Sequence, residues 1–126
     1  MEVVMLTSIL DSMKTAVDVP VSDDTYDEEL LMGINTIFFT LNQLGVGPET
    51  PFTIDDNSTE WTDFISDIET IAMVKTYMQL RLKLLFDPPS NSSLATAMKE
   101  QVAEYEWRMN VAKDTYKVEE VVNNGG

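Results

Sequence analysis

The sequence predicts an all-α protein, a small bundle of about four helices followed by an extended C-terminal tail. Apolar residues recur at three- and four-residue spacing through most of the chain. The prolines, and the glycines other than Gly33, fall between or after these stretches, where they interrupt regular structure. The 126 residues are 44% hydrophobic, which is enough for one buried core. We therefore expect one helical domain over residues 1–114 and a flexible or partner-pairing tail over 115–126.

The first helix is expected from Val3 to Val17, where Asp18-Val19-Pro20 ends it. Its apolar stripe consists of Leu6, Ile9, Leu10, Met13 and Val17.

The second helix has a clear start signal. Thr25 is a candidate N-cap, and Glu28 follows three residues later in the capping-box pattern. Acidic residues in the first turn, which the helix dipole favours, are Asp27, Glu28 and Glu29. The expected core stripe is Leu30, Ile34, Ile37, Phe38 and Leu41, and Gly45 or Gly47 should end the helix.

A long connection over 45–57 should carry Phe52 and Ile54 tucked beneath it. Asn57 with Glu60 then predicts the start of a third helix, from Ser58 to Phe86. Its main stripe is Phe64, Ile68, Ile71, Ala72, Met78, Leu82 and Phe86, and a second stripe is Met73, Tyr77, Leu80 and Leu84. A helix apolar on two sides is either the centre of a bundle or a contact between subunits. The second stripe supplies our subunit-interface candidates.

A corner at Pro88-Pro89 separates the third helix from a fourth, because proline cannot continue a helix. The candidate caps of the fourth helix are Asn91, Ser92 and Ser93, and it should run from Ser93 to Ala112. Its core stripe includes Leu94, Met98, Val102, Tyr105 and Met109. Trp107 lies off this stripe, so it is either packed locally or an interface anchor.

The tail is rich in β-branched and aromatic residues, which favour strands. It either frays without a partner or pairs with another chain, and the candidate docking residues are Tyr116, Val118, Val121 and Val122.

The net charge is −14, and its distribution is uneven. Up to Val74 there are 15 acidic residues and only Lys14 as a base, whereas from Lys75 onward there are 7 of each sign. Such a domain repels free nucleic acid. The acidic surface either maintains solubility or has a role, such as lining a passage for DNA or facing a basic partner. The candidates are Asp23, Asp24, Asp27, Glu28, Glu29, Asp55 and Asp56.

Most enzyme chemistry is missing from the sequence. There is no histidine and no cysteine, so the common nucleophilic triads and structural zinc sites are excluded. The five glycines form no phosphate-binding motif, and no acidic cluster follows a calcium-loop pattern. We expect no enzyme, no cofactor, no metal and no membrane span.

The stretch from Lys75 to Pro89, together with Met98-Lys99-Glu100-Gln101 and 104–110, resembles the head–tail connector proteins of tailed bacteriophages. The layout of residues 1–112 is similar to that of these small head-completion or adaptor proteins. The resemblance implies a structural virion protein at the capsid–tail junction, assembled in the host cytoplasm. Its copies would form a ring, commonly twelve-fold, around the channel through which DNA leaves. The implied partners are other copies, the portal protein and the next connector or tail component.

Two other functions fit the acidity. One is a DNA mimic that occupies the basic cleft of a nucleic-acid-binding protein, although the acids here gather at caps and loops. The other is a small helical protein–protein adaptor without a viral role.

Overall fold

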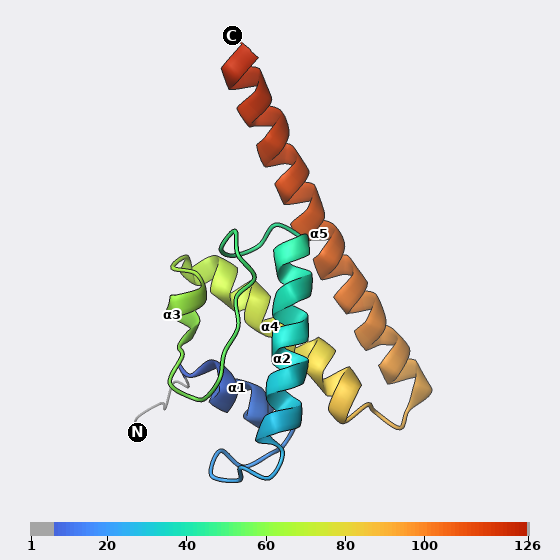
Figure 1. Cartoon of the computed structure of the whole chain (residues 1–126). Helices are drawn as coiled ribbons and strands as arrows, with labels where there is room; N and C mark the ends of the chain where they lie inside the picture. Colours follow the sequence, from blue (N-terminus) through green and yellow to red (C-terminus); the bar gives the residue numbers. More distant parts are fainter. Residues whose placement is uncertain (1–6, 126) are drawn as a thin grey trace, which may run out of the picture.

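The computed structural model describes residues 7–125, of which 112–125 are described by their backbone alone. This part of the chain is built from five helices: α1 (Ile9–Ala16), α2 (Asp27–Gln43), α3 (Trp61–Phe64), α4 (Ile68–Phe86) and α5 (Ser92–Gly125) (Figure 1). The only β pairing in it is one antiparallel bridge between Ser8 and Glu60. The predicted all-α class is confirmed.

α4 lies at the centre of the bundle and contacts α1, α2 and α5 (Figure 1). Its most deeply buried side chains are Val74, Tyr77, Met78 and Leu82, each 0% exposed. A helix covered by three others has to be apolar on more than one side. Of the two roles expected for this stretch, the structure confirms that of a central helix.

α2 buries the whole predicted stripe, since Leu30, Ile34, Ile37, Phe38 and Leu41 all belong to the core. Two hydrogen bonds from Asn35 on α2 hold the following loop against this helix. The side chain of Asn35 donates to the carbonyl of Ile54 and accepts from the N–H of Ile54. The rings of Phe38, Phe52 and Phe64 lie 4.9–5.2 Å apart between centroids. The loop therefore covers Phe52 and Ile54, as predicted.

α1 begins at Ile9, later than expected, because Ser8 caps it and accepts a hydrogen bond from the N–H of Asp11. Ser8 is extended (φ −68°, ψ 130°), and the backbone around it pairs with residues 59–61 through Ile9 N to Thr59 O (3.0 Å) and Trp61 N to Thr7 O (3.1 Å). Of the predicted helix, residues 3–6 lie outside the described part. The late start reflects pairing with a segment some fifty positions away, which local periodicity does not reveal.

Two predicted caps are wrong. α2 begins after Tyr26 without a side-chain cap, while the N–H of Thr25 bonds the Asp23 carboxylate inside the preceding turn. The stretch from Ser58 is not one helix but two. Its capping box is formed by Glu60 and Asp63, whereas Asn57 lies in the loop.

The break between α3 and α4 occurs at Ile65, which is extended (φ −154°, ψ 143°). This break lets the ring of Phe64 pack against Phe38 in the aromatic cluster, while α4 continues in a different direction. As a result Ile68, expected in the core stripe, is 79% exposed.

The corner between α4 and α5 matches its prediction. α4 ends at Phe86, and the side chain of Asn91 accepts hydrogen bonds from the N–H groups of Ser93 and Leu94. Met98 and Met109 are buried against the bundle, although Leu94 is exposed.

α5 does not end near Ala112 but continues to Gly125, where an extended tail was expected. Its C-terminal half projects beyond the other helices (Figure 1). Extending an existing helix by one residue costs less free energy than nucleating a new helix. Each β-branched residue raises the free energy of that extension by only about 0.5 kcal/mol.

Candidate assembly surfaces

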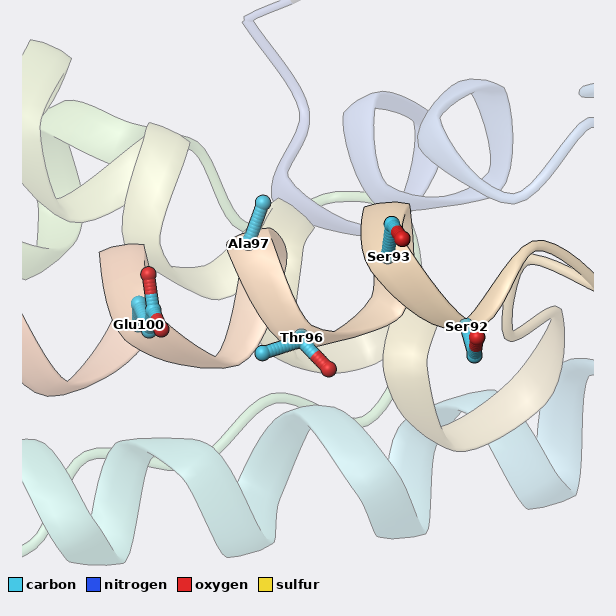
Figure 2. A pocket seen from close by; sticks show the side chains of 5 residues that line it. All are labelled: Ser92, Ser93, Thr96, Ala97 and Glu100. Carbon is cyan, nitrogen blue, oxygen red and sulfur yellow. The ribbon is translucent and has the colours of Figure 1, made fainter.

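The hollows found on the described part of the chain are shallow and lie on its surface. A shallow hollow of about 370 Å³ lies along the first turns of α5, and Figure 2 shows its lining side chains. They are Ser92, Ser93, Thr96, Ala97 and Glu100, and all are exposed. Hydroxyl groups and one carboxylate along a single exposed helix do not form an acid–base pair or an activated nucleophile.

Residues 7–111 include no group of three or more acidic side chains placed to hold a metal ion. No helix in the described range is long and apolar enough to cross a membrane.

The predicted acidic residues fall into two groups. Asp23 and Asp24 lie in the loop before α2, next to the three acids of its first turn. Asp55 and Asp56 lie in the loop after α2, directly beyond Ile54, which Asn35 holds beside the middle of that helix. The structure thus gathers five of the seven candidates at one end of α2 and leaves the other two apart.

Asp27 differs from the other acidic candidates because it forms an ion pair. Its Oδ1 lies 2.7 Å from Nζ of Lys14, whose side chain is only 4% exposed. Lys14 also donates to the backbone carbonyls of Val21 (3.2 Å) and Asp23 (2.9 Å). Asp27 therefore helps to anchor the 17–26 loop, and its charge is already compensated.

Asp23 and Asp56 are held in the charged form by local hydrogen bonds. The side-chain hydrogen bond from Thr25 lowers the pKa of Asp23, and that from Ser58 lowers the pKa of Asp56. Apart from Asp27, none of the seven acidic candidates forms an ion pair within residues 7–111. Six of them thus present uncompensated carboxylates.

The subunit-interface candidates have different environments. Met73, Leu80 and Leu84 are partly buried, and Trp107 is 65% exposed on the side of α5 away from α4. Tyr77 is 0% exposed and bonds Glu106 of its own chain, so it is a core residue and not a contact for a neighbour. The docking candidates Tyr116, Val118, Val121 and Val122 fall where only the backbone is described, and that backbone is helical.

Sequence reasoning missed an apolar surface on the outer side of α2. Met32 is 69% exposed and Phe39 is 53% exposed, and their seven-residue spacing puts them on one face two turns apart. Because both lie off the core stripe, a second search for apolar residues outside that stripe would have found them.

A protein-family model described as phage connector protein matches residues 9–116, which is most of the chain. The match begins at the first residue of α1, spans α2 to α4 completely and ends within α5. No curated protein and no solved structure matches the chain.

Proposed function

The chain belongs to the phage connector protein family, and we propose that it is a structural virion protein forming a ring beneath the portal. In this role it bridges capsid and tail and encloses the channel through which DNA leaves. The observation that carries the proposal is the family match over residues 9–116, which covers all the helices of the bundle. Members of this family have a structural role, which is consistent with the exposed surfaces described above.

The charge distribution supports a role beside DNA. Exposed carboxylates repel the phosphates of a passing duplex, so DNA would not adhere to the wall. Screening limits this repulsion to about 8–10 Å at physiological salt, which is comparable to a narrow gap between duplex and wall. The uncompensated acids, Asp23, Asp24, Asp55 and Asp56 among them, are therefore our candidates for the channel or its rim.

The projecting end of α5 supports docking on the portal. It extends the chain beyond the bundle, where a partner can reach it (Figure 1). We propose that residues 115–125 meet the portal as the end of a helix. Strand pairing through Tyr116, Val118, Val121 and Val122 would first require this helix to unwind.

The direct test is the assembly state of the purified chain, alone and mixed with portal protein. We expect rings in negative-stain images, and a mass by light scattering that is a multiple of the 14.2 kDa chain. A chain that stays monomeric in both samples contradicts the proposal. Tight binding of that monomer to a basic nuclease or repressor would favour the DNA-mimic function instead.

A second experiment tests the channel. Replacing Asp23 and Asp24 by lysine should slow DNA ejection or alter genome retention, since the wall would then attract phosphate. Asp27 is left unchanged because its pair with Lys14 supports the fold. Glu49→Lys, in the loop after α2, is a control for added positive charge. Ejection indistinguishable from that of the wild type would argue against a lumen position for Asp23 and Asp24.

A third experiment tests docking. A chain ending at Asp114 should keep the bundle, because the last buried side chain within residues 7–111 is Met109. We expect this truncated chain to lose co-sedimentation with the portal while its helical circular dichroism persists. Full-strength portal binding by the truncated chain would refute docking through the end of α5.

A further inference from the structure

An apolar hollow opens on the surface of the helical hairpin formed by α4 and α5. It has a volume of about 230 Å³ and is lined by Arg81, Leu84, Leu85, Lys99 and Val102. We call these five residues the hairpin hollow. Three of them are aliphatic and two are cations, and no carboxylate lines it. Leu85 is 57% exposed, so much of its apolar surface is in contact with water.

The two cations of the hairpin hollow differ in their surroundings, since the guanidinium of Arg81 lies 5.9 Å from the centroid of the Tyr77 ring. Arg81 donates to the hydroxyl of Tyr77 (3.2 Å), and the side chain of Lys99 is exposed. Within residues 7–111 neither of them forms an ion pair. The hairpin hollow therefore fits a partner that presents an apolar side chain beside carboxylates.

The same chain carries such a surface on α2. Glu28 and Glu29 are exposed in the first turn, and Met32 follows one turn later on the same side with 69% of its surface exposed. We call these three residues the α2 knob. α2 contains no lysine or arginine that could compensate the two carboxylates. Methionine is unbranched and adaptable, which suits it to filling an irregular hollow.

We propose that the α2 knob of one copy docks in the hairpin hollow of the next copy. Met32 would enter between the leucines and Val102, while Glu28 and Glu29 would face the two cations. This inference rests on the proposed function, since it specifies how the ring closes. The knob and the hollow lie on different helices of one chain, so the contact is heterologous and can repeat from copy to copy around a ring.

The charge asymmetry of the sequence supports a second copy as the occupant. Apart from Lys14, which is buried, every basic residue follows Val74, while the acidic excess precedes it. A head-to-tail contact brings the acidic part of one copy against the cation-bearing hairpin of its neighbour. It also divides the acidic candidates: Glu28 and Glu29 belong to the subunit contact, and the loop acids remain for the channel.

Cross-complementation between two charge-reversed variants tests the contact. One variant carries Lys99→Glu, and the other carries Glu28→Lys with Glu29→Lys. Each changes exposed side chains only, and circular dichroism checks that the fold is kept. Alone, the Lys99→Glu variant exchanges one attraction for a repulsion and the lysine variant faces two cations, so each should assemble at least about tenfold more weakly than the wild type. Mixed in equal amounts, they should assemble better than either alone. Half of the contacts in an alternating ring then keep the wild-type charges, and in the other half the introduced lysines meet the introduced glutamate, with Arg81 as the one remaining like charge.

Lys99→Arg and Glu49→Lys are the matched controls. The first keeps the cation and should assemble normally, and the second adds positive charge away from the α2 knob. Assembly is measured by light scattering and negative-stain imaging under the conditions in which the wild type forms multimers.

Two results overturn the inference while leaving the proposed function intact. In the first, the wild type forms rings and either reversed variant assembles equally well. In the second, both variants fail but their mixture does not recover. A wild type that forms no multimer, with or without portal protein, contradicts the proposed function itself and the inference with it.

Discussion

Tyr77 on α4 donates its phenolic hydrogen to the carboxylate of Glu106 on α5, with 2.7 Å between the two oxygens. The ring of Tyr77 is 0% exposed, and Arg81 donates to the same hydroxyl oxygen from one turn along α4. This contact joins the two arms of the hairpin in the middle of the fold. It shows how a residue expected at a subunit interface serves the core of its own chain.

Tyr77→Phe should leave the fold intact and lower the free energy of unfolding by about 1 kcal/mol, the usual net value of one hydrogen bond. The loss is small because the partly exposed Glu106 can be solvated by water instead. Urea unfolding followed by circular dichroism measures it. Tyr26→Phe is the control, since Tyr26 is 52% exposed, and it should change stability by less. A loss of 3 kcal/mol or more in the phenylalanine variant would mean that the hydroxyl organises more of the hairpin than this bond.

The Tyr77 hydroxyl should also make stability depend on alkaline pH. Burial, followed by the hydrogen bond to Glu106, raises the pKa of Tyr77 to about 12 from 10.0. Because the folded-state pKa is raised, its contribution to stability is complete below about pH 10. That contribution is lost as the pH rises through the folded-state value near 12. Ultraviolet titration should show a late tyrosine ionisation near that pH, and Tyr77→Phe should remove that late step. A late step that persists in the variant belongs to another tyrosine.

Lys14→Met should destabilise the protein by about 1–3 kcal/mol, because it removes a buried cation and leaves the Asp27 carboxylate, which is 32% exposed, without its partner. The carbonyls of Val21 and Asp23 also lose their donor. Hydrogen exchange should therefore rise first in the 17–26 loop, and chemical denaturation should give the overall loss. Lys75→Met, on the partly exposed side of α4, is the control for removing one positive charge. Equal stability of the two variants would show that the Lys14–Asp27 pair is not an anchor.

The sequence predicts much of this fold that depends on local pattern, although the local cap signals at Thr25 and Asn57 are wrong. The α2 stripe, the Pro88-Pro89 corner and the Asn91 cap need only neighbours within a few positions, and the structure confirms all three. The late start of α1 and the break at Ile65 depend on distant partners, namely the 59–61 segment and the aromatic cluster. Spacing along one helix carries no information about either.

The candidate surfaces follow the same division. Trp107 is found from the sequence because its position off the stripe can be counted, and it is exposed. The hairpin hollow cannot be found from the sequence, since Leu84 and Val102 come together only when α4 and α5 pack. Lys14 is the clearest case: a lone base among 15 acids gives no sign in the sequence that it is buried at a junction of carbonyls and a carboxylate.

Trp107→Ala should separate assembly from folding. With 65% of its surface exposed, Trp107 adds little to the bundle, so we expect a change in unfolding free energy within about 0.5 kcal/mol. If it anchors a contact between copies, its removal should weaken assembly at least about tenfold, as for buried aromatic anchors in other interfaces.

Two further variants are comparisons for the Trp107 result. Met109→Ala, two residues along α5 but 3% exposed, should show the reverse pattern and cost about 2–5 kcal/mol of stability. Ile68→Ala, 79% exposed on α4, controls for the loss of any exposed apolar side chain. Assembly is read by light scattering and folding by thermal circular dichroism. If Trp107→Ala and Ile68→Ala assemble equally well, Trp107 contributes only local packing on α5 and the ring is held by other surfaces.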